Sequence, residues 1–213
     1  MRKITVISAG LSTPSSTRML ADQLAQKTQQ HLSELGIEAE VQTFELRDYA
    51  HEIMNNMVAG FADQKLTELI DATVAADGLI VVTPIFSTSY SGLFKSFIDI
   101  LDPDSLTGTP VLIGANAGTA RHSLAIDYAI RPLFAYLHTE PVSTGVFAAS
   151  EDWSDGGDKV APLSSRVNRG ASELAHAMSQ KAAKQGVYDP YDPDSYEAAG
   201  RSFGHLLGGF TDR

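Results

Sequence analysis

Two short, continuous apolar runs near the middle of the chain constrain its fold more than any other feature. They read GLIVVTP (78–84) and PVLIGAN (110–116), and each precedes a segment whose apolar residues recur at helical spacing. An uninterrupted apolar run of this length is typical of a strand that is buried on both faces. Strands that alternate with helices form a parallel sheet covered on both faces. The chain therefore predicts an α/β fold.

The rest of the chain continues this alternation. Further strands are expected at residues 4–7, 37–46 and 141–148, and helices at 16–35, 63–77, 91–101, 122–137 and 162–185. Pro132 predicts a kink in the fourth helix, and Lys95 predicts an ion pair with Asp99 four residues later. We expect one domain over residues 1–185. Residues 186–213, rich in Asp, Pro, Tyr and Gly, form either a partly ordered terminus or an oligomer contact.

Charge and composition exclude several classes of function. The net charge of −10 disfavours binding to nucleic acids and to anionic lipids. The absence of Cys excludes disulfides, thiolate catalysis and iron–sulfur clusters, and the scattered His residues suggest no metal site. We see neither a signal peptide nor a membrane-spanning run, so a cytoplasmic protein is expected.

A loop rich in hydroxyl groups joins the first expected strand to the first helix. Residues 8–17 (SAGLSTPSST) include six serines and threonines. In a parallel α/β sheet this loop lies at the carboxyl edge, where ligands bind, and it leads into a helix N-terminus that attracts anions. It has neither the triphosphate-loop nor the dinucleotide-binding glycine pattern. A helix cap accounts for one or two hydroxyl groups. Six hydroxyl groups in one short loop favour a site that binds a phosphate group.

Two further loops fall at the same edge of the predicted sheet. In the second, TPIFSTSYSGLFK (83–95), Pro84 is expected to end the strand, and Ile85 and Phe86 offer apolar surface beside several hydroxyl groups. In the third, NAGTARH (116–122), Gly118 permits close backbone approach. Each loop also has a purely structural interpretation. Phe86 fits a packing role in which its ring covers the edge of the sheet, and the polar end of the third loop fits the solvated start of a helix. Together the loops suit a flat aromatic ring that carries a phosphate, such as FMN.

The three loops, in this order and spacing, resemble the NADPH-dependent FMN reductase family. In the first loop Ser15 and Thr17 stand at that family's serine and asparagine positions. Ser12 stands at its arginine position, a departure that leaves the phosphate with hydroxyls in place of a guanidinium. The second loop matches the family pattern P-x-Y-x-x-S-x-x-G-x-L-K at Pro84, Phe86, Ser89, Gly92, Phe94 and Lys95. Phe86 replaces the tyrosine, and Phe94 replaces the leucine. The resemblance covers about residues 3–180.

The resemblance implies a flavodoxin-like three-layer sandwich with a five-stranded parallel sheet of order 2-1-3-4-5. It implies hydride transfer from NADPH or NADH to FMN, which needs no catalytic side chain of the protein's own. More narrowly, the first loop resembles reductases that supply reduced flavin to luciferase-like flavin monooxygenases. A homodimer or homotetramer is implied as well.

Each loop contributes residues to the cofactor site that the resemblance implies, and no metal ligand is expected. These residues are Gly10, Leu11, Ser12, Ser15, Ser16 and Thr17 in the first loop, Pro84, Ile85, Phe86, Ser87, Thr88 and Ser89 in the second, and Asn116, Ala117, Gly118, Thr119 and Arg121 in the third. Arg121 fits either the negative charge of reduced flavin or the phosphate of NADPH.

Three other functions stay open at this stage. A quinone or azo-dye reductase would retain its FMN, a flavodoxin-type electron carrier would not turn over NADPH, and a flavin-binding subunit of a monooxygenase complex would be recognised by its partner. Flavodoxins are expected to carry a T/S-x-T-G-x-T phosphate loop, which this chain lacks. The sequence does not distinguish NADPH from NADH, or FMN from FAD.

Overall fold

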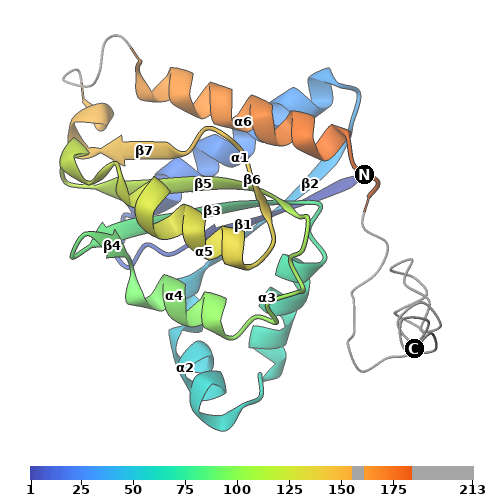
Figure 1. The fold of residues 1–213 in the computed structure, drawn as a ribbon, viewed down its shortest axis with the longest axis vertical. Coiled ribbons are helices and arrows are strands. Elements are labelled where there is room, and N and C mark those ends of the chain that lie inside the picture. The colour runs from blue at the N-terminus through green and yellow to red at the C-terminus, as the bar shows by residue number, and fades with distance from the viewer. Residues whose placement is uncertain (155–160, 184–213) are drawn as a thin grey trace, which may run out of the picture.

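A parallel sheet between two layers of helices forms the body of the molecule (Figure 1). The computed structural model describes residues 1–154 and 161–183. The strands are β1 (Arg2–Ser8), β2 (Ala39–Glu45), β3 (Gly78–Phe86), the short antiparallel β4 (Ser89–Tyr90), β5 (Pro110–Ala117), β6 (Glu140–Pro141) and β7 (Val146–Ala149). Their order is β2-β1-β3-β5-β6, and β7 also pairs with β5. This confirms the predicted order 2-1-3-4-5, with β6 and β7 in the place of the fifth strand.

The helices divide between the two faces of the sheet (Figure 1). One face carries α1 (Ser16–Glu34) and α6 (Leu163–Ser179), and the other carries α3 (Gln64–Val74), α4 (Gly92–Asp99) and α5 (Arg131–Tyr136). The predicted pairing of Lys95 with Asp99 on α4 is confirmed, with Nζ at 2.5 and 2.6 Å from the carboxylate oxygens.

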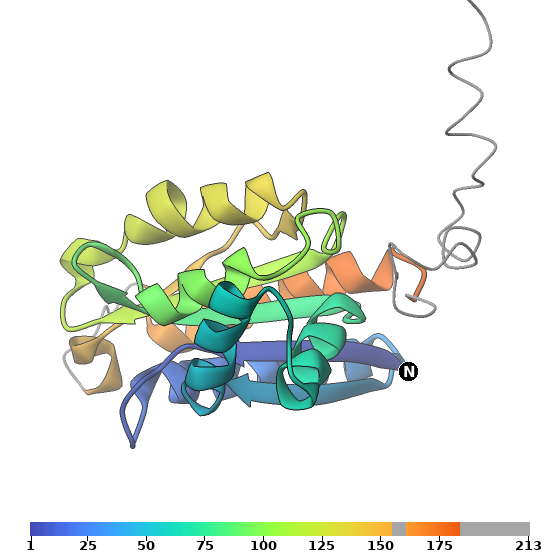
Figure 2. The same cartoon turned by 90° about the horizontal axis from the view of Figure 1, so that it is seen from below.

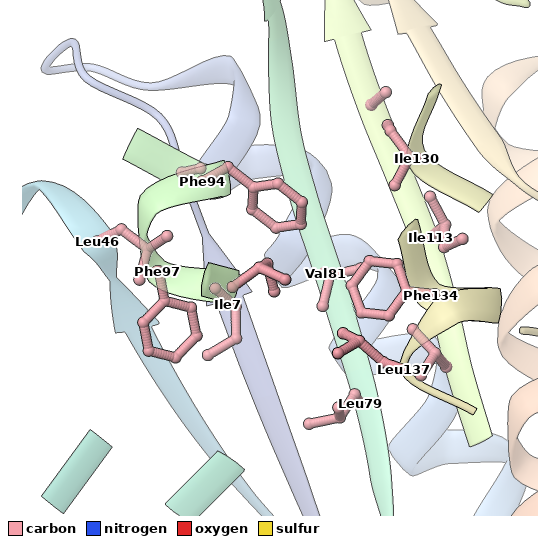
Figure 3. Packing of buried hydrophobic residues seen from close by; sticks show 14 of the residues in the cluster. Ile7, Leu46, Leu79, Val81, Phe94, Phe97, Ile113, Ile130, Phe134 and Leu137 are labelled. Atoms are coloured by element: carbon pink, nitrogen blue, oxygen red, sulfur yellow. The ribbon is translucent and has the colours of Figure 1, made fainter. Parts of the chain in front are cut away.

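The core on the α4 and α5 side is built around three fully buried phenylalanines (Figure 3). Phe94 and Phe97 of α4 and Phe134 of α5 pack against strand residues that include Val81 and Ile113. Burying a side chain of this size contributes about 2–3 kcal/mol. The central strands are therefore held firmly, which fixes where their carboxyl ends lie.

Helix α1 follows directly from its sequence. Ser15 caps it by accepting a hydrogen bond from the Arg18 amide at 3.2 Å. Leu20, Leu24 and Leu32 recur at helical spacing and are fully buried. Gly36, with φ of 73°, follows the last turn in the left-handed conformation that favours glycine. The expected helix over 16–35 is confirmed to within one residue.

The sequence analysis missed one helix, α2 (Ala50–Ala59), which follows a 3₁₀ turn over Leu46–Tyr49. Of the α2 residues only Ile53 is buried, whereas Met54, Met57 and Val58 are exposed. A helix that directs most of its apolar residues to the surface lacks the periodic apolar stripe from which helices are predicted.

The expected helix over 122–137 is confirmed over residues 125–136, but it is not a regular α-helix. A 3₁₀ turn (Ala120–His122), a π-helical segment (Ile126–Ile130) and then α5 occupy this stretch. Pro132 follows closely on the π-helical segment, so the chain is already helical when it reaches the proline, and the amide of Arg131 still bonds to the Ile126 carbonyl. The proline therefore lies inside a helical run whose hydrogen-bonding pattern changes from π to α beside it.

The expected strand over 141–148 is divided into β6 and β7. Between them, the Arg131 guanidinium donates to the carbonyls of Val142 and Ser143 at 2.9 and 3.1 Å. The Glu173 carboxylate accepts from the Thr144 amide and hydroxyl at 2.7 and 2.6 Å. Side chains thus satisfy polar groups that a continuous strand would offer to its neighbour.

The proposed domain boundary at residue 185 and the segment 186–213 lie outside the described residues, so they stay predictions. Within the described ranges, no helix combines the length and the apolar character that crossing a lipid bilayer requires.

Candidate functional site

The loops after β1, β3 and β5 gather at one edge of the sheet, at the carboxyl ends of the strands (Figures 1 and 2). Parallel pairing produces this arrangement, because β1, β3 and β5 are neighbours that run in the same direction. In open α/β sheets this edge is where ligands bind. The three predicted loops are thus brought together.

The first loop turns tightly at Gly10. A Cβ atom built at Gly10 would lie 2.1 Å from Ser15 Oγ and 2.9 Å from Thr17 Cβ. The start of α1 therefore packs directly on the loop, and only glycine leaves room for it. Beyond this turn, residues 11–14 are exposed and project from the edge (Figure 2).

The hydroxyl-bearing residues of the first loop differ in how exposed they are. Ser12 and Ser16 are exposed, whereas Ser15 and Thr17 are 7% and 3% exposed. Thr17 Oγ1 lies 2.8 Å from Asn116 Oδ1, and Asn116 Nδ2 donates to Ser16 Oγ at 2.9 Å. Asn116 therefore ties the third loop to the first, and Ser12 and Ser16 have the hydroxyls most open to a ligand.

One buried hydroxyl at this edge has no partner within the described part of the chain. Ser8 is fully buried at the carboxyl end of β1, and no hydrogen bond to its Oγ is found among those residues. Buried polar groups are normally hydrogen-bonded, so an orphaned hydroxyl is more common at functional sites. Ser8 lies at the base of the first loop, and a hydroxyl left unpaired there by the described residues is consistent with a polar ligand that binds at this edge.

Pro84 does not end its strand, contrary to expectation. Strand β3 continues to Phe86, and Pro84 pairs with Asn116 of β5. The pairing of β1 with β3 stops at Val82, where the chain of β1 has already entered the first loop. Beyond that point β3 no longer pairs with β1, and β4 pairs with it only from Ile85, so a proline without an N–H group is tolerated between the two pairings.

The second loop is a tight hairpin between β3 and β4. Ser87 and Thr88 have φ of 49° and 71°, so both central residues of the turn are left-handed. Two-residue hairpins with two positive φ angles usually contain Asn and Gly, and a β-branched threonine there is strained. This turn holds Phe86, which is 49% exposed, at the edge, while Ile85 packs into the core. Phe86 is thus the apolar side chain of the pair that stays open to a ligand.

The third loop leaves open space beside its glycine. A Cβ atom built at Gly118 would meet no atom within 4 Å, so the protein's own packing does not require glycine there. Thr119 caps the following turn by accepting from the Arg121 amide at 3.4 Å, and Arg121 itself is exposed. The space beside Gly118 fits the predicted close approach of a ligand.

The sequence analysis missed a cationic group beside the first loop. Arg47, two residues after β2, donates from Nη1 to the Ser12 carbonyl at 2.6 Å and to the Thr13 hydroxyl at 2.5 Å. Its other nitrogen Nη2 lies 2.9 Å from Glu45 Oε2. The signal was the position of Arg47 at the end of the strand next to β1. Within the described residues, no cluster of three or more His, Asp or Glu side chains could hold a metal ion.

Comparisons with known proteins point to one family. Residues 2–154 match the model of the family described as NADPH-dependent FMN reductase. The FMN reductase (NADPH) of Pseudomonas aeruginosa is 32% identical over 81% of this chain and 90% of its own length. The NADH-dependent FMN reductase SfnF of Pseudomonas putida is 34% identical over 70% of this chain and 78% of its own length.

Solved structures agree with these matches. A crystal structure of an oxidoreductase from Corynebacterium diphtheriae has a TM-score of 0.82 and 47% identity, over 85% of this chain and 99% of that one. The NADH:FMN oxidoreductase EmoB, in its apo form, has a TM-score of 0.71 and 26% identity over the whole of both chains. A flavodoxin-like WrbA protein from Agrobacterium tumefaciens, at 18% identity and a TM-score of 0.58, shares the fold.

Proposed function

The chain belongs to the NADPH-dependent FMN reductase family and is an NAD(P)H:FMN oxidoreductase, and we propose that the three loops at the carboxyl edge of the sheet form its FMN site. The observation that carries the proposal is the first loop. Gly10 is packed under Ser15 and Thr17, exposed Ser16 is the first residue of a 19-residue helix, and exposed Ser12 precedes it in the same loop. Hydroxyl donors and free helix amides together suit a phosphate monoester.

In this proposal each loop holds a different part of FMN. Ser12, Ser16 and the first amides of α1 bind the phosphate, while Ser15 and Thr17 keep those groups in place. Phe86 and the backbone of the Ser87–Thr88 turn border the flavin ring on one side, and Gly118 and Thr119 border it on the other. Once bound, FMN supplies the hydride-accepting ring. The protein's part is to bind, orient and screen that ring from water.

The decisive experiment measures flavin-dependent turnover. Protein stripped of flavin is mixed with NADPH or NADH, and oxidation of the nucleotide is followed with and without free FMN. We expect oxidation that saturates with FMN. The Ser16→Ala variant should raise the apparent FMN constant several-fold, whereas Ser33→Ala, an exposed serine near the far end of α1, should leave it unchanged. Oxidation that requires a quinone while the flavin stays bound would contradict FMN as the released acceptor.

We propose further that reduced FMN leaves this site and is consumed by a flavin-dependent monooxygenase. The openness of the edge supports this, because Ser12, Phe86 and Gly118 are all exposed. Anaerobic reduction followed by rapid filtration should recover most of the reduced FMN in the filtrate. Recovery of the flavin with the protein would instead support a retained cofactor. Because NAD(P)H is the electron donor, we propose the cytoplasm as the compartment.

We also propose that the protein is a homodimer or homotetramer. Leu124, Tyr128 and Tyr136, which lie near or on the π-helical segment and α5, are 61%, 81% and 69% exposed. Large apolar side chains grouped on one surface often mark a subunit contact. Light scattering coupled to size-exclusion chromatography should give a mass of two or four chains, and the Tyr128→Glu variant should lower it.

A further inference from the structure

The first loop carries no charged side chain of its own. Residues 8–17 contain only small, apolar and hydroxyl-bearing side chains. A phosphate monoester carries close to two negative charges at neutral pH. Hydroxyls and helix amides lower the cost of binding it but do not neutralise it. A cation that reaches this loop from elsewhere in the chain would therefore change how strongly it binds phosphate.

Arg47 is placed to reach the loop by the pairing of β2 with β1. Ser8, the last residue of β1, pairs with Glu45, the last residue of β2. The next residue, Leu46, is fully buried and anchors the 3₁₀ turn that carries Arg47 (Figure 3 labels Leu46 at the end of β2). The guanidinium is thus held at the same edge as the loop by two rigid strands.

Two carboxylates lie beside this guanidinium: Asp48, whose Oδ1 is 3.8 Å from Nε, and Glu45, which forms an ion pair with it without a hydrogen bond to Oε2 among the described residues. Glu45 Oε2 lies 2.9 Å from Arg47 Nη2, and Glu45 Oε1 lies 3.2 Å from Nη1 of Arg18, in the first turn of α1. The hydrogen bond to Asp22 raises the pKa of Arg18 above its ordinary value, so this group also stays charged. Glu45 therefore lies between two guanidinium groups beside the start of α1.

The hydrogen bonds that Arg47 donates go to the exposed part of the loop. Nη1 donates both to the carbonyl of Ser12 and to the hydroxyl of Thr13. These residues contribute nothing to the apolar core, so the contacts restrain a projecting loop and do not support packing. The planar guanidinium places Nη1 on the loop while Nη2 stays beside Glu45, a geometry that the single ammonium of lysine cannot reproduce.

We infer that Arg47 is a positioning residue for phosphate binding, which holds the Ser12 end of the first loop in its ligand-binding shape through its hydrogen bonds to Ser12 and Thr13. This inference rests on the FMN site proposed above and adds a residue from a different strand to it. It predicts a specific signature. Loss of Arg47 should weaken binding of FMN, which has a phosphate, much more than binding of riboflavin, which does not.

The test measures the affinities of the flavin-free, full-length protein for FMN and for riboflavin by quenching of flavin fluorescence. We expect Arg47→Ala to weaken FMN binding about tenfold, the scale of a lost hydrogen bond to a charged group, and to change riboflavin binding by less than about twofold. Arg47→Lys keeps the positive charge but lacks the planar guanidinium. Its affinity for FMN should lie between those of wild type and Arg47→Ala.

Lys65 provides the matched control. Its Nζ donates to the carbonyl of Asp48 in the same 3₁₀ turn and pairs with Glu52 at 2.9 Å, and no contact with the first loop is found for it. Lys65→Ala removes an equal charge from the same region and should leave the ratio of FMN to riboflavin affinity unchanged.

Thr13→Ala tests the contact from the loop side. Thr13 is not among the residues assigned to bind FMN, so its hydroxyl should matter only through Arg47. We expect a two- to fourfold loss of FMN affinity in the wild-type background and little further loss in the Arg47→Ala background. Should Arg47→Ala fail to fold, Arg47→Lys and Thr13→Ala carry the test.

The outcomes separate the two proposals. If wild-type protein binds FMN no better than riboflavin, the phosphate role of the first loop is wrong and the role of Arg47 is wrong with it. If wild type prefers FMN and Arg47→Ala keeps that preference, only the inference about Arg47 is overturned. Equal weakening of both flavins, together with a lower Tm, would also overturn it, because it would assign Arg47 to stability alone.

Discussion

The two edges of the same sheet differ in how their polar groups are satisfied. At the amino edge, where strands begin, the buried carboxylate of Asp77 accepts from the Lys3 amide at 2.7 Å and pairs with Arg2 at 3.5 Å. Arg2 also donates to the carbonyl of Lys181 after α6, and the Lys181 ammonium lies 2.6 Å from Glu140. This network joins the first strand to the last described helix.

The carboxyl edge differs in its polar groups and its backbone. It has a buried hydroxyl at Ser8 that lacks a hydrogen-bond partner within the described part of the chain, exposed Phe86, and left-handed Ser87 and Thr88. At the amino edge two of the left-handed positions are Gly36 and Gly108, which adopt this conformation without strain, and His138 is the exception. Ion pairs therefore brace both edges, through Asp77 at the amino edge and Glu45 at the carboxyl edge, but among the described residues the carboxyl edge adds an unmet buried hydroxyl and two adjacent left-handed residues, as expected where a ligand binds.

The largest effect should come from breaking the amino-edge network. Asp77→Ala leaves the Lys3 amide and Arg2 without this carboxylate, and we expect a loss of about 3 kcal/mol in the free energy of unfolding. Urea unfolding measures it. The FMN constant should stay unchanged, because the two edges are at opposite ends of the strands. Asp71→Ala, an exposed carboxylate on α3, is the control and should cost less than about 0.5 kcal/mol. A changed FMN constant in Asp77→Ala would contradict the division between the edges.

Gly10→Ala should affect the carboxyl edge next most strongly. The added methyl group would meet Ser15 Oγ at 2.1 Å, and such overpacking costs about 1–3 kcal/mol. Because the start of α1 must move, FMN affinity should fall more than stability alone would suggest. Thermal unfolding and FMN titration measure the two effects. Gly92→Ala, where a Cβ meets no atom within 4 Å, should lower neither the thermal stability nor the affinity for FMN. Unchanged FMN binding in Gly10→Ala would argue against the phosphate role of this loop.

Asn116→Ala removes the link between the first and third loops. Both side-chain hydrogen bonds, to Thr17 and to Ser16, would be lost, and we expect a cost of about 1–2 kcal/mol together with a several-fold weaker FMN affinity. Calorimetry of FMN binding checks the second effect. Asn168→Ala, on α6, removes an exposed contact with His31 and should change neither quantity.

Thr88→Gly should have the smallest effect and the opposite sign. Glycine adopts φ of 71° without strain, so we expect a gain of about 0.5–1 kcal/mol in the free energy of unfolding. The same substitution at Ser89, an ordinary strand residue of β4, should lose about 0.5–1 kcal/mol. If both variants lose stability, the hairpin is not strained. If Thr88→Gly also weakens FMN binding, the strained turn serves the site.

The order of elements could be predicted because it depends on local patterns. The runs 78–84 and 110–116 are buried strands of the sheet, and the Leu spacing of α1 is that of a helix with one buried face. The failures also have local causes. Helix α2 exposes Met54, Met57 and Val58, so its sequence lacks the apolar periodicity of a helix with one buried face. Pro84 was expected to end its strand because the sequence does not reveal that the pairing of β1 with β3 has already stopped at Val82.

The contacts that shape the candidate site could not be predicted in the same way. The sequence identified the hydroxyl loop, yet it did not reveal that Thr17 meets Asn116, 99 residues away, or that Arg47 holds Ser12 from 35 residues away. Such contacts depend on which strand ends become neighbours, and no local periodicity encodes that.

The sequence by itself determined the alternation of strands and helices, the three loops and the resemblance to a flavin reductase family, because apolar periodicity and loop composition are properties of adjacent residues. Only the tertiary structure decided which hydroxyls stay open to a ligand, that Ile85 packs inward while Phe86 does not, and that a guanidinium from β2's end reaches a loop without charge. Those outcomes follow from strand order and register, which place distant residues at one edge of the sheet.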